Sequence, residues 1–527
     1  MSVMARALAI VALVFALSAP ARAQDLNDRV NFRISLSGMY LRETQSDDDA
    51  RKIAGPLSIG YGDLRTVLDV RRLPGNFELH LDGRIRLTGN FDTGTADTGS
   101  SQTTARGYLG GREYQINELW ARGRWSKIDL GLGRMIVPEA DALRIDGVRF
   151  WAHVHKRWDV SAYAGGYPDP YSRSVTTDYV AGSTPGAGAA FIGGVSARYG
   201  YERIWGSVSA NAAYLGGNDD GGPVTLGANA TTANPQTEKL RAYVTWTNFW
   251  RPFKYVDFYH DLVLDVAGAA GVQLTRLNLH VAGHISKSFT IRAGYDHMSA
   301  LAIEMYLTRL LANRTDFIPT VIENNLTLSR TARDEGQLAL EASLNRTVIT
   351  VEGRFRRRVL VTPSNDPQFV YQPGHDDVGA QVAPSLGYEA TLAVRDRGSL
   401  AGLRPSGWVT YLNDYRSRNV YVGLGLGRDF FRDRLSVDLN LTYANTHDDQ
   451  VQNAPGCPAG SGPTQLAALQ GCFGTRNGNN VQAGITVGGT PAKHWYGFVD
   501  YRAGVALSEG APVVITHVLL ARIEARY

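Results

Sequence analysis

Apolar and polar residues alternate along several segments of this chain, each about 10 to 14 residues long. A repeat of two places successive side chains on opposite faces of a β-strand, so each segment predicts a strand with one apolar and one polar face. Strands in soluble proteins are usually nearer five or six residues. This length therefore favours tilted strands that cross a bilayer. The clearest segments span residues 77–88, 255–266, 347–358, 435–443 and 481–487, and the last fifteen residues, 513–527, alternate in the same way.

The connections between these segments alternate between short and long. The short turns fall at residues 73–75, 126–127, 155–157, 286–287, 345–346 and 491–493. The long polar loops fall at residues 91–112, 167–190, 216–237, 298–331, 360–382 and 446–478. Short periplasmic turns and long extracellular loops are typical of transmembrane barrels, and we count about 22 strands within a range of roughly 16 to 24. Hydrocarbon cannot bond a free sheet edge, so the sequence predicts an all-β, closed antiparallel barrel.

The first 23 residues have the layout of a secretory signal peptide. Arg6 precedes an apolar run over residues 7–17, and Ala21-Arg22-Ala23 provides a small-x-small cleavage site. An N-terminal membrane anchor is the alternative, but the run is too short to span a bilayer as a helix. We expect cleavage after residue 23 and a single barrel domain over residues 24–527.

Charge and cysteine content exclude several classes of protein. The formal net charge is +4, which gives no basis for nucleic-acid binding. Cys457 and Cys472 lie in a Gly/Pro/Asn-rich stretch, and in an exported protein we expect a disulfide between them, with two free thiols as the alternative. Two cysteines are too few for a typical structural zinc site, and we predict no metal or cofactor.

Together, the signal peptide, the alternating strands and the terminal aromatic Tyr527 resemble the Gram-negative outer-membrane β-barrel superfamily, in its porin-like branch. The segment Gly131-Leu132-Gly133-Arg134, followed by Asp146-Gly147-Val148, is similar to a stretch in several porin-like barrels. The resemblance implies a multi-pass outer-membrane protein that contacts lipid. It also implies that the barrel-insertion machinery reads the final strand and Tyr527. Members are mostly diffusion channels, and others are enzymes, adhesins or parts of envelope machines.

Charged residues recur on the polar faces, where we expect them to line the pore. They are the arginine ladder Arg354, Arg356 and Arg358 with Glu352; the acidic ladder Asp257, Asp261 and Asp265; and the mixed set Glu78, Asp82, Arg84 and Arg86. Ladders of side-chain charge set ion selectivity in a water-filled pore. The alternative, of equal weight, is a structural network in which the charges neutralise each other across the lumen.

The sequence favours a channel for small hydrophilic solutes or ions. The alternative is a structural barrel in an envelope-spanning secretion, adhesion or motility assembly, with periplasmic or outer-membrane protein partners. We predict no enzyme, because His280 and His284 would lie about 13 Å apart on a strand and no nucleophile motif is present. Residues 303–311 repeat apolar side chains at helical spacing within a long loop. Tryptophans are expected at the membrane interfaces, with lumen positions as the alternative for each.

Overall fold

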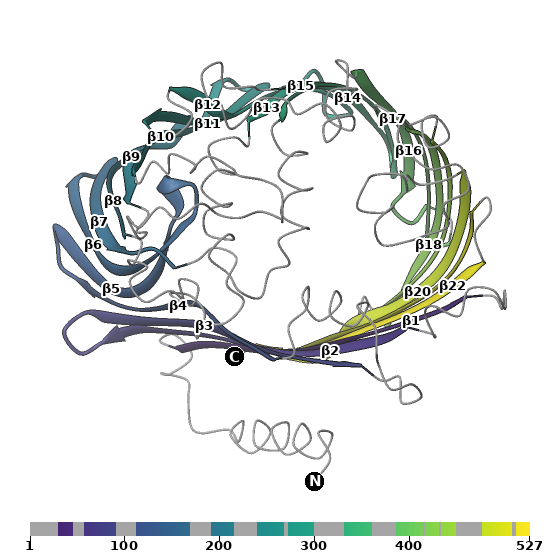
Figure 1. The fold of residues 1–527 in the computed structure, drawn as a ribbon, viewed down its shortest axis with the longest axis horizontal. Helices are drawn as coiled ribbons and strands as arrows, with labels where there is room; N and C mark the ends of the chain where they lie inside the picture. The colour runs from purple at the N-terminus through teal and green to yellow at the C-terminus, as the bar shows by residue number, and fades with distance from the viewer. Residues whose placement is uncertain are drawn as a thin grey trace, which may run out of the picture.

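The computed structural model describes residues 30–45, 57–90, 112–168, 191–214, 240–267, 272–299, 331–360, 386–399, 401–414, 417–431, 434–448, 477–508 and 513–526. These residues form one sheet of 22 strands, each antiparallel to its neighbours in the chain. The first strand also pairs with the last, so the sheet closes into the wide ring seen in Figure 1. The predicted fold class and strand number are confirmed.

The strands follow one another along the chain, and within the described ranges one short 3-10 turn, η2, lies inside a hairpin. Their bounds are β1 Val30–Gln45, β2 Leu57–Leu73, β3 Phe77–Asn90, β4 Arg112–Arg124, β5 Ile128–Val137, η2 Pro138–Ala140, β6 Leu143–His155, β7 Trp158–Gly166, β8 Phe191–Tyr201, β9 Ile204–Tyr214, β10 Leu240–Phe253, β11 Val256–Ala267, β12 Gln273–His284, β13 Phe289–Ser299, β14 Thr331–Leu344, β15 Thr347–Leu360, β16 Leu386–Asp396, β17 Leu403–Asp414, β18 Ser417–Phe430, β19 Leu435–Asp448, β20 Gly478–Ala492, β21 Trp495–Ser508 and β22 Val514–Arg526.

The seam between β1 and β22 closes the barrel over almost the full length of both strands. The register runs from Arg33 opposite Arg526 to Gln45 opposite Val514. On β22, Ile523 is 55% exposed while Glu524 is 1% exposed between Arg522 and Arg526. The alternation predicted for the last strand therefore separates an outward apolar face from an inward charged one.

The outer face of the barrel is apolar and exposed. A soluble protein would cover such a surface, whereas the lipid-facing strands of a membrane barrel leave it bare. The fold is therefore that of a transmembrane β-barrel, and its exposed apolar side chains are distributed around the whole ring. Examples are Leu130, Leu132, Val195, Leu338, Val351, Phe355, Leu392, Leu424, Leu439 and Val499. Among the described residues, no helix is long and apolar enough to cross a membrane.

The short turns lie where the sequence predicts them. Asn76 and Asn345 adopt positive φ angles of 62° and 56° in two of these turns, a backbone conformation that asparagine tolerates better than most residues. Residues 1–29, the predicted helical repeat, Cys457, Cys472 and Tyr527 lie outside the described residues. The signal peptide, the disulfide and the insertion signal therefore stay predictions.

Tryptophans divide between the two faces of the wall. Trp158, Trp246 and Trp250 are 39%, 45% and 46% exposed on the outer face, as expected of an interface girdle. Trp120 and Trp151 instead line a pocket on the inner side. For these two residues, the lumen alternative is the correct one.

Candidate functional site

The hairpin formed by β5 and β6 leaves the barrel wall at one pair of glycines. Gly133 lies opposite Gly147, and pairing with the outer neighbours ends one residue later, at Arg134 with β4 and at Asp146 with β7. Gly133 has a φ of +127°, and a Cβ there would overlap the Leu119 carbonyl. A Cβ at Gly147 would overlap the Ala164 carbonyl. These two glycines let the hairpin backbone approach the backbones of β4 and β7 closely at the bend. This explains why the sequence has glycine at Gly133-Arg134 and at Asp146-Gly147.

Charged side chains bond the backbone at the place where β5 separates from β4, which we call the fork. Arg134 pairs with Asp146 across the hairpin through two bonds of 2.6 and 2.5 Å. The same guanidinium donates to the Ile116 carbonyl oxygen at 3.1 Å. Glu118 accepts the backbone N–H of Ile136 at 3.3 Å. These bonds replace ladder bonds that the two strands lose when they part.

Past the fork, the tip of the hairpin packs against the inner side of the wall, as the curled ribbon in Figure 1 shows. The 3-10 turn η2 contacts β8, β9 and β10. Val137, Ala140 and Ile145 have no exposed surface. Apolar burial of this kind holds the tip inside the lumen. The cluster consists of Met135, Val137, Ala140, Ile145, Tyr163, Ile192 and Ala213.

Glu139 anchors the tip by its side chain and its backbone. Its carboxylate binds Arg149 at 2.7 Å and also Arg198. Ser209 donates its hydroxyl to the Glu139 carbonyl oxygen at 2.8 Å, and Thr245 donates to the same atom. Burial acts to raise the pKa of the Glu139 carboxyl, but the two guanidiniums outweigh it and hold the pKa below its ordinary value.

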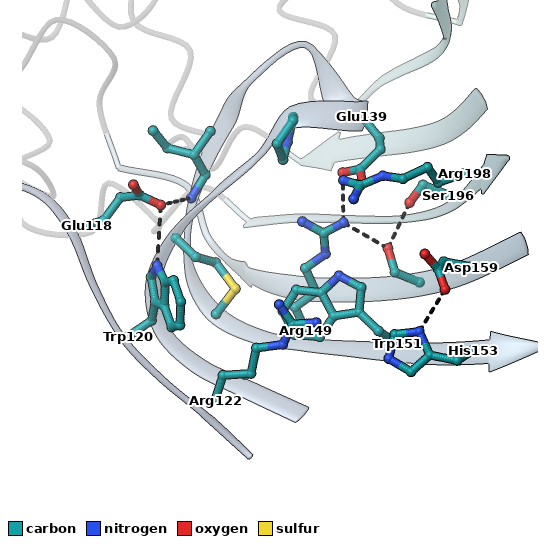
Figure 2. A pocket seen from close by; sticks show the side chains of 15 residues that line it. Glu118, Trp120, Arg122, Glu139, Arg149, Trp151, His153, Asp159, Ser196 and Arg198 are labelled. Carbon is teal, nitrogen blue, oxygen red and sulfur yellow. Dashed lines mark hydrogen bonds and ion pairs between the residues drawn. The ribbon is translucent and has the colours of Figure 1, made fainter. Parts of the chain in front are cut away.

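A pocket of about 210 Å³ lies beneath the hairpin, and Figure 2 shows the side chains that line it. The Trp151 ring lies at the centre of the pocket. The guanidinium carbons of Arg122 and Arg149 stack over this ring, 4.2 and 4.6 Å from its centroid. A Cβ at Gly131 would approach the Trp151 ring to 3.0 Å, so the glycine makes room for the indole. The pocket thus combines an aromatic surface with cationic groups.

Two histidines flank this region, and each lies between two carboxylates. His153 bonds Asp159 at 2.7 Å and approaches Asp129 to 3.2 Å. His80 bonds Asp69 at 2.6 Å and stacks on Trp120 with 5.2 Å between ring centroids. The indole N–H of Trp120 donates to Glu118 at 3.3 Å. Both signs of charge therefore surround the pocket.

The acidic ladder of β11 has a separate arginine for each carboxylate. Asp257 pairs with Arg251 at 2.5 Å, and Asp265 pairs with Arg241 at 2.6 Å. Asp261 pairs with Arg276 at 2.6 Å, and this arginine also reaches Asp141 in the hairpin at 2.7 Å. The ladder is thus neutralised from β10 and β12, and it helps to hold the tip.

The arginine ladder of β15 is likewise paired. Arg354 bonds Glu352 on its own strand at 2.5 Å. Arg356 lies between Glu335 of β14 at 2.9 Å and Glu389 of β16 at 2.7 Å. Arg358 belongs to the same strand, and its side chain is outside the described part of the chain.

The mixed set near β3 forms a third network. Glu78 pairs with Arg124 at 3.1 Å, and Asp82 accepts two bonds from Arg65, the shorter at 2.6 Å. The remaining two arginines, Arg84 and Arg86, both approach Asp63 and Glu113.

Every predicted pore-lining charge whose side chain is described has an oppositely charged partner on its own or a neighbouring strand. This arrangement is the neutralised network that the sequence left as one of two alternatives, and a role in ion passage stays a prediction. Sequence reasoning missed the partners Glu335 and Glu389 and the anchor Glu139. The glycine motif was the available signal for the hairpin. Among the described residues, no cluster of His, Cys, Asp or Glu is arranged to hold a metal ion.

The fold and the hairpin define a 22-stranded membrane barrel with an inward-folded connection between β5 and β6. No protein-family model matches the sequence, and no curated protein matches it. Among solved structures, the chain is similar to OccAB4 of Acinetobacter baumannii, with 7% identity, a TM-score of 0.37, and coverage of 95% of this chain and 100% of that one.

Two further solved structures are similar at the same low level. OccK2 of Pseudomonas aeruginosa in complex with glucuronate has 6% identity, a TM-score of 0.40, and coverage of 95% of this chain and 98% of that one. The translocation pore of the P pilus usher PapC has 8% identity, a TM-score of 0.39, and coverage of 94% and 99%. Similarity this low transfers neither substrate nor activity to this chain.

Proposed function

We propose that this protein is a porin-like channel of the Gram-negative outer membrane that passes small hydrophilic solutes or ions. The observation that carries the proposal is the division of the wall into an apolar outer face and an inner face of paired charges. Leu338 and Val351 are 51% and 49% exposed outside, while Glu335 and Arg356 pair inside. An inner face of this kind suits water, because each ion pair would be costly to bury without polar surroundings.

The β5–β6 hairpin folds into the lumen and narrows the channel on that side of the wall. Buried apolar packing among the described residues is concentrated around this hairpin, and elsewhere the inner wall is mainly polar. A solute that passes the hairpin would meet the pocket, whose lining combines the indole of Trp151 with arginines that are paired to Asp129 and Glu139. Such a site would favour some solutes over others without closing the path.

Ion selectivity in planar bilayers tests the proposal. The purified protein is expected to give discrete conducting steps. Neutralising Arg354, Arg356 and Arg358 together should shift the ion selectivity, measured from the reversal potential, toward cations, because Glu335 and Glu389 lose their partners. The matched control neutralises Asp257, Asp261 and Asp265 and should shift it toward anions. A correctly folded barrel without conductance would contradict the channel and favour the structural assembly component instead.

A further inference from the structure

Positive charge surrounds the barrel at the rim that holds its short turns. The connections from each even-numbered strand to the next, β2–β3 to β20–β21, are two to six residues long, and they share one rim because consecutive strands run antiparallel. All but the first contain a lysine or an arginine, and Arg71 and Arg72 come just before the first. Glu202 and Asp433 are the acidic residues in these turns. The exposed cations at this rim include Lys127, Lys156, Arg157, Arg203, Lys254, Lys287, Arg346, Arg397, Arg434 and Lys493.

The rim charge is not balanced in the way that the lumen charge is. The carboxylates close to these turns have other partners, because Asp129 pairs with Arg122, and Asp257 pairs with Arg251 at 2.5 Å. Neighbouring turns follow one another around the ring in Figure 1. Two strand spacings at a tilt of about 40° put them roughly 12 Å apart. A point midway between two turns is therefore about 6 Å from both, within the Debye length of about 8 Å, so their positive potentials overlap.

Exposed apolar side chains accompany the cations at this rim. Phe253 and Tyr255 flank Lys254 and are 68% and 56% exposed. The Lys254 Nζ lies 5.5 Å from the Tyr255 ring centroid, and the guanidinium carbon of Arg157 lies 4.7 Å from that of Tyr201. In four other turns the cation follows an exposed apolar residue by two positions: Trp125 and Lys127, Tyr201 and Arg203, Ile285 and Lys287, and Leu344 and Arg346. A rim that faced water alone would leave these apolar side chains without a favourable environment, whereas rings and long basic chains both suit the headgroup layer of a membrane.

We infer that the short-turn rim binds anionic phospholipids, and that these lipids form a ring around that end of the barrel. The phosphate of each lipid lies against the lysines and arginines of one or two turns. Its acyl chains lie along the outward apolar side chains beside those turns. An acidic protein matches the charge of the rim alone. The apolar side chains favour lipid because they continue into the lipid-facing wall, as Trp158 does into Val160, which are 39% and 41% exposed.

Quenching of tryptophan fluorescence by brominated lipid tests the lipid ring. The full protein is reconstituted in vesicles of phosphatidylcholine and phosphatidylglycerol at a fixed ratio, with bromine on the acyl chains of one lipid at a time. Trp125, Trp158 and Trp250 are exposed near these turns and report the lipid beside them. Phosphatidylglycerol is expected to occupy these positions about fivefold more often than its mole fraction predicts, the factor for one added cationic contact. High salt should reduce this excess, because it screens exposed charge.

A matched pair of variants shows whether the rim charge is responsible. One variant carries glutamine in five successive turns: Lys127→Gln, Lys156→Gln, Arg157→Gln, Arg203→Gln, Lys254→Gln and Lys287→Gln. The control exchanges lysine for arginine and arginine for lysine at the same six positions, which keeps the charge. The glutamine variant should lose the excess of phosphatidylglycerol, and the control should retain it.

Three outcomes would overturn the lipid ring. The first is quenching of the parent protein in proportion to mole fraction. The second is an unchanged excess in the glutamine variant. The third is a parent protein without lipid preference whose rim binds polyglutamate and loses that binding in the glutamine variant, which would assign the rim to an acidic protein partner. Ion conduction does not depend on the lipid ring, so either proposal can fail without the other.

Discussion

Substituting Glu139→Gln tests whether the hairpin tip is held in the lumen by its charge. In the docked state, the Glu139 and Arg149 side chains are 3% and 4% exposed. Glutamine retains the shape and can still bond, but it leaves Arg149 with an unbalanced buried charge. Breaking a buried pair costs about 3 to 5 kcal/mol. The undocked fraction should therefore rise between about a hundredfold and a few thousandfold.

Cysteine accessibility measures that fraction. Ala140 has no exposed surface when the tip is docked, so Ala140→Cys, in a background with Cys457 and Cys472 replaced by serine, should react with a water-soluble thiol reagent only after undocking. Glu139→Gln should accelerate the reaction by the same factor. Glu352→Gln removes a pair with Arg354 that is partly exposed on the wall and should leave the rate unchanged.

A paired replacement separates charge from shape at the same position. Glu139→Met with Arg149→Met removes both buried charges and should return the rate toward that of the parent protein, because no buried charge is left uncompensated and Arg198, which also loses its partner, is 55% exposed to water. If Glu139→Gln reacts no faster than its parent while the barrel remains folded, the tip is not held by this ion pair.

Three further predictions concern the hairpin and the loops. Gly133→Val should prevent the inward bend and raise single-channel noise, because its side chain would overlap the Leu119 carbonyl; Gly62→Val, where a Cβ meets nothing, is the control. The lowered pKa of Glu139 gives stabilisation that is present above about pH 4.3 and is lost as the pH falls through the lower folded value. Relative to a fully exposed cysteine at the same pH, Ala140→Cys should therefore stay protected at pH 5 and lose that protection in stronger acid. Peptide mapping without reduction should recover Cys457 and Cys472 in one disulfide-linked species, and two free thiols would contradict this.

The barrel was predictable because its physical requirements repeat along the chain. Alternation over residues 77–88 and 347–358 appears in the structure as outward Ile85 and Phe355 and inward Arg86 and Arg356. The seam between β1 and β22 follows from the need to leave no free edge in lipid.

The ion pairs and the pocket were not predictable in the same way. Charges on one strand are visible in the sequence, but their partners depend on the register of the next strand. Arg356 meets Glu335 and Glu389, which are 21 and 33 residues away. A shift of one residue in the strand register would move the Trp151 ring from the inner face of the wall to the outer face. The hairpin bend depends on Gly133 facing Gly147, and each glycine alone resembles many others in the chain.

Passage of uncharged solutes tests the water-filled lumen most directly. Liposomes that contain the purified protein should swell in small sugars at a rate that rises with protein content, and swelling should fall as the sugar size increases past the width left by the hairpin. Glu139→Gln should extend passage to larger sugars. Folded, inserted protein that produces no swelling with the smallest sugar would contradict the channel.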